Sequence, residues 1–227
     1  MNFFVGGYFI VKGFKNDAIG YIPHNYFTVS DCISDIIPNT WAWNKTLSKQ
    51  DRKEVKINYS LSDEQIESIR KDVLELIEKS RFQLPTNTFS NIGYARTFYS
   101  QYFSHLENVK LLGVSLNEKY INEFLDEEGK DDFGISSNLS SYKCIETDGR
   151  FIGYEVLGYE YSGFHTMYCH RNLINHCKIE LHIHFNDNGL IDKFEDAEKI
   201  IDSIRSEKIG AEPALWQPWA VYEFDTV

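Results

Sequence analysis

The side chains best suited to chemistry are concentrated between residues 163 and 185. This window holds five of the seven histidines and two of the four cysteines of the chain. They are His165, Cys169, His170, His176, Cys177, His182 and His184. Imidazole and thiolate groups bind metal ions and also act as acids, bases and nucleophiles. A reaction catalysed by this chain would therefore be expected to use this window.

Helical spacing predicts one possible metal-binding arrangement. If the segment after Gly163 is helical, His165, Cys169 and His176 lie on one stripe, whereas His182 and His184 share one face of a following strand. The two groups together could surround a zinc ion. The spacing matches neither a zinc finger nor an HExxH helix, so the sequence assigns no metal ligand unless the two groups converge.

A thiol nucleophile is the second chemical hypothesis. Cys169 and His165 are one helical turn apart and could form a thiolate–imidazole pair. Such a nucleophile also needs oxyanion donors and an orienting group, which the sequence does not reveal. A single buried cysteine is more often a small core side chain. Cys169 and His165 are therefore candidates, without a catalytic assignment.

Signatures of the common cofactor and nucleophile sites are missing. The chain contains no GxxxxGK[ST] phosphate loop, no GxGxxG and no GxSxG elbow. No cofactor is therefore predicted.

Composition and charge narrow the class of protein. The formal charge of −11 argues against nucleic-acid binding, and suits a basic protein partner or simple solubility. The four cysteines form no CxxC pair, which favours free thiols in a reducing cytoplasm. No segment reaches the roughly 18 apolar residues of a membrane span.

Two surface features are candidate partner contacts. One is an acidic cluster at the end of a predicted helix, where negative charge is unfavourable for the helix itself. Its members are Asp126, Glu127, Glu128, Asp131 and Asp132. The other is the aromatic pair Trp216 and Trp219. The alternatives are a solvated charged loop and a C-terminal strand that buries its tryptophans in the core.

The patterning predicts an α+β fold, with a mostly antiparallel sheet of several hairpins and four to five packed helices. The clearest helix begins at Ser62, which forms a capping box with Gln65, and continues to about Ser80. A second box, Ser115 with Glu118, predicts a helix that ends at Gly129. Asp192 is the expected cap of the last helix. Further helices are expected over residues 95–106 and 192–207.

Alternating apolar residues and turn signals predict the strands. A hairpin is expected from residues 2–14 and 18–22, and another around Asp148-Gly149 from residues 142–147 and 150–160. Single strands are expected at residues 55–59, 109–114 and 220–224. Residues 133–141 are expected to be a loop and a weak subdivision within a single domain covering residues 1–227.

The C-terminal third resembles a group of small bacterial proteins. The phrases YEVLGYEYSGFHTMYCHRN, GLIDKFEDAEKI and GAEPALWQPW, within residues 150–220, are similar to acidic immunity proteins of polymorphic or contact-dependent toxin systems. The resemblance implies an intracellular protein that masks a basic toxin domain, and it carries over no functional residue. The alternatives are a metal-dependent or thiol enzyme that uses His165, Cys169 and His176, and a structural domain without a ligand. The sequence does not specify an oligomeric state.

Overall fold

The computed structural model describes residues 1–13, 22–23, 25–38, 48–129, 132–161, 163–206, 209 and 211–226. Within these ranges, eight strands form one antiparallel sheet in the order β3-β4-β1-β5-β8-β6-β7, with β2 paired to β1. The strands are β1 (Phe3–Lys12), β2 (Asp35–Ile37), β3 (Phe82–Gln83), β4 (Thr88–Phe89), β5 (Val109–Asn117), β6 (Arg150–Glu160), β7 (Gly163–Thr166) and β8 (Leu215–Phe224). The predicted α+β class and antiparallel sheet are confirmed.

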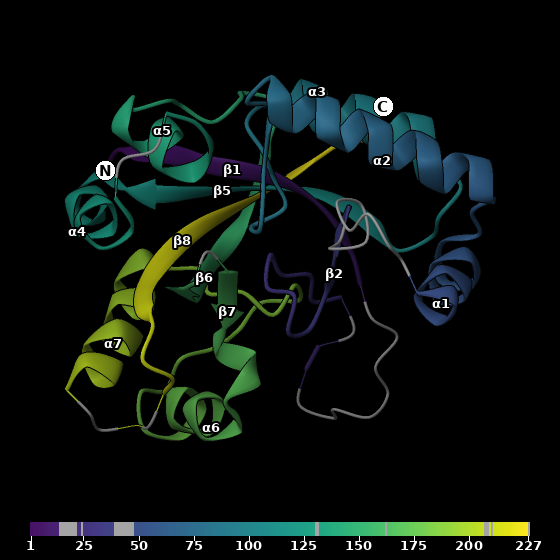
Figure 1. Ribbon diagram of the computed structural model, residues 1–227. Coiled ribbons are helices and arrows are strands. Elements are labelled where there is room, and N and C mark those ends of the chain that lie inside the picture. The colour runs from purple at the N-terminus through teal and green to yellow at the C-terminus, as the bar shows by residue number, and fades with distance from the viewer. Residues whose placement is uncertain are drawn as a thin grey trace.

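The described residues form seven α-helices, which is more than the four to five expected. They are α1 (Lys49–Tyr59), α2 (Asp63–Glu78), α3 (Ile92–Tyr102), α4 (Glu118–Glu128), α5 (Gly134–Ser140), α6 (Arg171–Ile179) and α7 (Phe194–Arg205). Figure 1 shows α1, α2 and α3 gathered at one end of the molecule and α4 to α7 around the other. None of the helices in the described ranges is long and apolar enough to cross a membrane.

The central strand β1 contributes to apolar clusters on both faces of the sheet. Phe9 and Val11 belong to the cluster that includes residues of α4 to α7, whereas Tyr8 and Ile10 belong to the cluster formed with α1, α2 and α3. Successive side chains of a strand point to opposite faces, so a strand covered on both sides is almost continuously apolar. This explains the apolar N-terminal run in the sequence.

The helix predicted after Ser62 is confirmed as α2. The Ser62 hydroxyl accepts a hydrogen bond from the Gln65 amide at 3.2 Å, and the Gln65 side chain accepts one from the Ser62 amide at 2.8 Å. The buried face carries the apolar stripe that was read from the sequence. Its fully buried members are Ile66, Ile69 and Val73.

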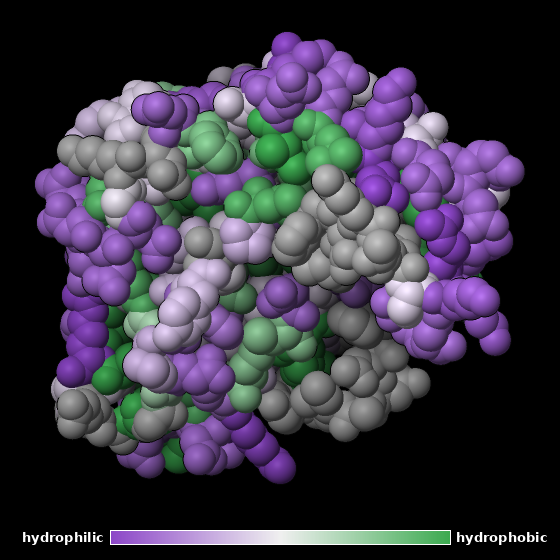
Figure 2. Space-filling view, viewed as in Figure 1, coloured by the Kyte–Doolittle hydropathy of each residue, from purple (hydrophilic) through white to green (hydrophobic). Residues whose placement is uncertain are grey.

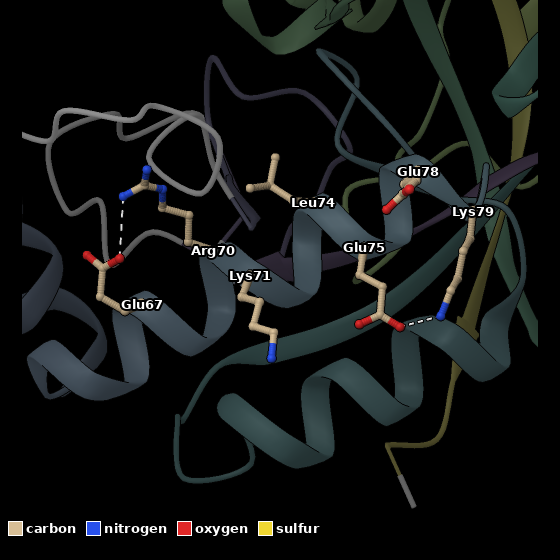
Figure 3. Close-up of a pocket in the computed structure, with 7 residues that line it drawn as sticks. All are labelled: Glu67, Arg70, Lys71, Leu74, Glu75, Glu78 and Lys79. Atoms are coloured by element: carbon tan, nitrogen blue, oxygen red, sulfur yellow. Dashed lines mark hydrogen bonds and ion pairs between the residues drawn. The ribbon is translucent and has the colours of Figure 1, made fainter.

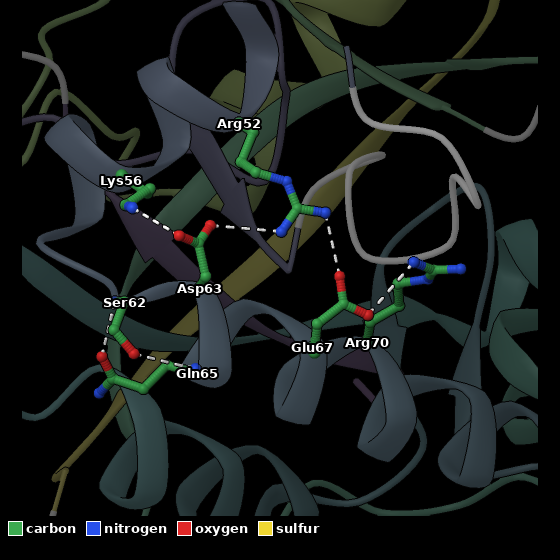
Figure 4. A network of polar contacts seen from close by, with 7 residues as sticks. All are labelled: Arg52, Lys56, Ser62, Asp63, Gln65, Glu67 and Arg70. Carbon is green, nitrogen blue, oxygen red and sulfur yellow. Dashed lines mark hydrogen bonds and ion pairs between the residues drawn. The ribbon is translucent and has the colours of Figure 1, made fainter. Parts of the chain in front are cut away.

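An exposed ion-pair network joins α1 to α2 (Figure 4). Arg52 contacts Asp63 at 3.3 Å and Glu67 at 3.0 Å, and Lys56 contacts Asp63 at 2.8 Å. Glu67 also pairs with Arg70 at 3.4 Å. Exposed pairs contribute only about 0–1 kcal/mol each. The buried apolar stripe therefore determines how α2 packs, and the network adds a modest preference for the angle of α1.

The strand predicted at residues 55–59 is wrong, because this segment is the end of α1. Val55 and Tyr59 are buried four residues apart, whereas Ile57 between them is 66% exposed. Five residues are too few to distinguish alternation from one helical turn. The deciding signal is the capping box of Ser48 with Asp51, seven residues upstream of Val55.

Two predicted caps are also wrong. Ser115 is buried within β5, and the cap of α4 is Asn117, whose side chain accepts a hydrogen bond from the Lys119 amide at 3.2 Å. At α7 no side chain caps the first turn, and Asp192 instead accepts a hydrogen bond from Asn186 at 2.9 Å. Because β5 continues directly into α4, the capping pattern in the sequence places the start of this helix two residues too early.

Residues 133–141 do not form the predicted loop, because 134–140 are the helix α5. Its Asn138 side chain donates to the Gly6 carbonyl of β1 at 2.9 Å, and the Ile135 amide donates to Gln83 at 3.0 Å. Apart from the buried Ile135 and Leu139, the residues of this helix are Gly, Ser and Asn, which have weak helix propensity. Tertiary hydrogen bonds to β1 and β3 therefore stabilise this helix.

The structure confirms neither of the two predicted hairpins, although it confirms the antiparallel sheet. Residues 142–147 form no strand, and β6 pairs instead with β7 and with the C-terminal β8. In the first hairpin, β1 is confirmed, but residues 14–21 lie outside the described ranges, and the described neighbours of β1 are β2, β4 and β5. Turn signals predict local pairing, whereas the pairs of β6 with β8 and of β1 with β5 join distant segments.

Candidate functional site

The histidine-rich window forms three elements rather than one helix. Strand β7 is followed by a 3-10 turn (Met167–Cys169) and then by α6. Thr166 ends the strand and caps the turn by accepting a hydrogen bond from the Tyr168 amide at 3.3 Å. The predicted stripe of His165, Cys169 and His176 therefore does not exist, because each residue belongs to a different element.

The five candidate metal ligands do not converge. His176 lies in α6, and His182 and His184 are exposed residues after it, with His182 in a left-handed conformation at φ 52° rather than on a strand. Among the described residues, no three His, Cys, Asp or Glu side chains are placed to share a metal ion. The zinc hypothesis needed that convergence, so its ligand set is not formed.

A different set of residues meets at the edge strand β7. Cys32 Sγ lies 3.6 Å from His165 Nδ1, and Cys169 is a hydrogen-bond partner of the Cys32 thiol. Glu212 Oε2 approaches the same Nδ1 at 3.3 Å and lies 3.8 Å from His170 Nε2. We call Cys32, Cys169, His165 and Glu212 the thiol cluster. Its members come from the loop before β2, from the 3-10 turn, from β7 and from the segment before β8.

The two thiols of the cluster have opposite acidities. The hydrogen bond from Cys169, with smaller contributions from Ser30 and His165, lowers the pKa of Cys32 to about 5. The same contact and burial raise the pKa of Cys169 far above its usual range. Thiolates are nucleophiles and thiols are not. Of the two thiols, Cys32 is therefore the one suited to act as a nucleophile, whereas the sequence had named only Cys169 and His165 as candidates.

The geometry around His165 differs from that of a hydrolytic triad. In a triad, the nucleophile contacts one ring nitrogen and the carboxylate holds the other. Here Cys32 and Glu212 approach the same nitrogen, Nδ1. The arrangement surrounds an imidazole with two acidic groups.

A buried polar network fixes the loop that carries Cys32. Glu155 of β6 is fully buried, and its Oε1 accepts hydrogen bonds from the hydroxyls of Tyr26, of Thr28 at 2.8 Å and of Thr166 at 2.8 Å. Burial raises the pKa of Glu155 to about 7. The network holds the loop against β6 and β7, the strands that precede Cys169.

Short hydrogen-bonded steps connect this network to Cys32. The Ser30 amide donates to the Thr28 hydroxyl at 3.2 Å, and the Cys32 amide donates to the Ser30 hydroxyl at 3.4 Å. These local turns place the sulfur next to β7. The sequence did not indicate Cys32, Glu155 or Glu212, because isolated residues outside the window carry no spacing signal.

The acidic cluster borders a groove at the end of α4. The groove encloses about 590 Å³ between α4, the β6–β7 turn and the segment that leads into β8. It is lined by Glu127, Glu128, Tyr159, Glu160, Tyr161, Pro213, Ala214 and Leu215. We call this the acidic groove. Figure 2 shows that hydrophilic side chains predominate over α4.

The remaining candidate partner contacts divide into exposed and buried residues. Asp126 and Asp132 are exposed but do not line the groove, whereas Asp131 lies outside the described ranges. Trp216 and Trp219 are only 3% and 0% exposed, so they are not a recognition surface. They lie on β8 in the core, where Trp219 packs against Phe124. Among the described residues, Tyr161 is the most exposed aromatic side chain, at 90%, ahead of Tyr142 and Phe151.

A second depression runs along α2 (Figure 3). It encloses about 630 Å³, and its lining side chains all belong to α2. Their charges are partly paired, with Glu67 contacting Arg70 and Glu75 contacting Lys79. Because the lining comes from a single helix whose charges pair with each other, the depression does not combine side chains from different elements. We therefore assign no site to it.

No family model, curated protein or solved structure matches this chain. Its function is therefore inferred from its own geometry and charge.

Proposed function

We propose that this chain is a binding protein that masks a basic protein partner, and that this partner is a toxin domain, as the resemblance of residues 150–220 implies. The observation that carries the proposal is the acidic groove, where carboxylates from α4 and from the β6–β7 turn face one depression. Glu127, Glu128 and Glu160 line it, and the exposed Tyr161 stands at the same place. Acidic side chains that are far apart in the sequence are thus gathered on one surface.

The end of α4 strengthens the negative potential of this surface. The last turn of α4 contains Asp126, Glu127 and Glu128 and no basic residue. A helix C-terminus carries a partial negative charge, so these carboxylates destabilise the helix by roughly 0.3–1 kcal/mol each. The same arrangement attracts a cationic partner more strongly. These carboxylates therefore lower the stability of α4 and increase the attraction of this surface for a cationic partner.

The composition of the groove resembles that of a protein interface. Tyrosine is enriched at binding hot spots because it buries a large rigid ring and still offers a hydroxyl. Tyr161 would supply such an anchor, and the surrounding carboxylates would form the charged rim. With a net charge of −11, electrostatic steering would increase the association rate with a basic partner, most strongly at low salt.

The test is complex formation with the product of the gene that neighbours this one. We expect the two purified proteins to form a stoichiometric complex, with an association rate that falls as salt is added. The double variant Glu127→Lys/Glu160→Lys should slow association by roughly tenfold, because rim charges act mainly on the association rate.

A matched control reverses two exposed charges elsewhere. Glu54 and Glu78 are exposed on α1 and α2, at the other end of the molecule in Figure 1. The variant Glu54→Lys/Glu78→Lys changes the net charge equally and should retain most of the association rate. Equal slowing by both pairs would mean that net charge, and not the groove, drives binding. Absence of any complex with the neighbouring gene product would refute the proposal.

A further inference from the structure

The thiol cluster contains two exposed cysteines in contact, which the binding role does not use. Cys32 and Cys169 are both exposed, and the Cys169 thiol is a hydrogen-bond partner of Cys32. The loop before β2 carries one sulfur and the turn after β7 carries the other. We propose that Cys32 and Cys169 form a redox-active dithiol that exchanges with disulfide substrates.

The exchange balances without any further reactant. The Cys32 thiolate attacks one sulfur of a disulfide R–S–S–R, so that a Cys32–S–S–R bond forms and the first R–S⁻ leaves and takes a proton from water. Cys169 then loses its proton to solvent and attacks Cys32 Sγ, which releases the second R–S⁻ to be protonated in turn. Two electrons pass from the two thiols to the substrate. The products are a Cys32–Cys169 disulfide and two R–SH.

The surroundings of the sulfurs match these two roles. The attacking thiol must be ionised and accessible, and Cys32 is exposed with its sulfur 3.6 Å from an imidazole nitrogen. The resolving thiol must stay protonated until the mixed disulfide forms, and the raised pKa of Cys169 meets that condition. Glu212 Oε2 lies 3.3 Å from His165 Nδ1, so a carboxylate holds the imidazole that contacts Cys32.

The fold holds the two sulfurs together before any reaction occurs. Thr166, which caps the turn that carries Cys169, donates to Glu155. Tyr26 and Thr28, in the loop that carries Cys32, donate to the same carboxyl oxygen. One buried carboxyl group therefore connects both cysteine-bearing segments. Such preorganisation favours formation of an internal disulfide over a second exchange with the substrate.

The test uses oxidised glutathione as the disulfide and the reduced full-length chain. Intact mass and peptide mapping of the wild type should show the Cys32–Cys169 disulfide. Cys169→Ser should stop at one glutathione on Cys32, and Cys32→Ser should form neither product. Cys144 is exposed and lies outside the cluster, so Cys144→Ser is the matched control and should behave as the wild type.

A rate measurement tests the role of the cluster separately. At pH 6, a thiol of pKa 5 has about 300 times more thiolate than an ordinary thiol. Each such thiolate reacts about 30-fold more slowly, because nucleophilicity falls with pKa. Alkylation of Cys32 should therefore be about tenfold faster than alkylation of a model cysteine peptide. His165→Asn should reduce this advantage at pH 6 while the unfolding transition stays cooperative.

Two results would overturn the proposal. One is a wild-type product that keeps a bound glutathione and forms no internal disulfide. The other is glutathionylation of Cys144 as fast as that of Cys32. Both outcomes are independent of the acidic groove, because the groove variants Glu127→Lys and Glu160→Lys leave the thiol cluster intact.

Discussion

Glu155 is a fully buried carboxyl group, and its ionisation links the stability of the fold to pH. Its folded-state pKa of about 7 lies above the ordinary value because burial disfavours the charged form. Protonation of Glu155 therefore stabilises the fold, and this stabilisation is fully present below the unfolded-state pKa. It is lost as the pH rises through about 7.

We predict that Glu155→Gln removes this pH dependence. Relative to the variant, the wild type should lose about 3 kcal/mol of unfolding free energy between about pH 4.5 and pH 7, since one pKa unit corresponds to about 1.4 kcal/mol. Urea denaturation of both proteins across this range measures the difference. Glu127→Gln, which removes an exposed carboxylate, is the control. A wild-type minus variant difference that stays constant with pH would contradict the prediction.

Substitution of the buried Trp219 and substitution of the exposed Tyr161 should have opposite effects on stability and binding. Trp219 is fully buried, with ring contacts to Phe124 and Phe164. Trp219→Ala should therefore lower the unfolding free energy by about 3–5 kcal/mol, as large-to-small core changes do. Tyr161→Ala should change stability by less than about 0.5 kcal/mol and yet weaken partner binding. Chemical denaturation and binding measurements on both variants distinguish a core residue from a contact residue.

At the scale of elements, the boundaries of the helices depend on which polar residue caps them. Asn117, and not Ser115, caps α4, because β5 continues to Asn117 and buries the Ser115 hydroxyl. Within the described part of the chain, this hydroxyl has no hydrogen-bond partner. The strand and the helix thus share one polar residue at their junction.

We predict that Asn117→Ala lowers the unfolding free energy by about 1 kcal/mol, the usual cost of losing an N-cap. Ser115→Ala should be neutral or slightly stabilising, because it removes a buried hydroxyl without a partner. Thermal or urea unfolding of both variants is the measurement. A larger loss for Ser115→Ala than for Asn117→Ala would mean that Ser115 caps the helix after all.

At the scale of the whole molecule, the thiol cluster joins segments that are more than 100 residues apart. A cross-link over such a distance restricts the unfolded chain, and stabilisation by a loop of this size is at most about 4–5 kcal/mol. Formation of the Cys32–Cys169 disulfide would therefore affect global stability as well as local chemistry.

We predict that the oxidised wild type melts at a higher temperature than the reduced wild type. Cys144→Ser should show the same increase on oxidation, whereas Cys169→Ser should show none. Calorimetry of the oxidised and reduced forms measures the shift. An oxidised wild type that melts at or below the reduced form would show that the disulfide strains the native structure.

Local patterns in the sequence determined those elements whose signals lie within one element. The capping box and apolar stripe specify α2, the nearly continuous apolar run specifies β1, and the acidic residues predict an exposed surface at the end of α4. These features depend on neighbours within about four residues, and periodicity reports such neighbours directly. The segment of α1 was misassigned because five residues fit a strand as well as a helical turn. The segment of α5 was misassigned because tertiary contacts override its weak local preference.

The tertiary structure alone decided the site. Cys32 meets His165 only because buried hydrogen bonds to Glu155 hold its loop against β7, and Glu212 arrives through the segment that leads into β8. The sequence shows which reactive side chains are present but not that they contact one another, since pairing between distant strands leaves no periodic pattern in the sequence. The histidine-rich window therefore contains two members of the cluster, His165 and Cys169. The fold brings the other two, Cys32 and Glu212, to them from outside the window.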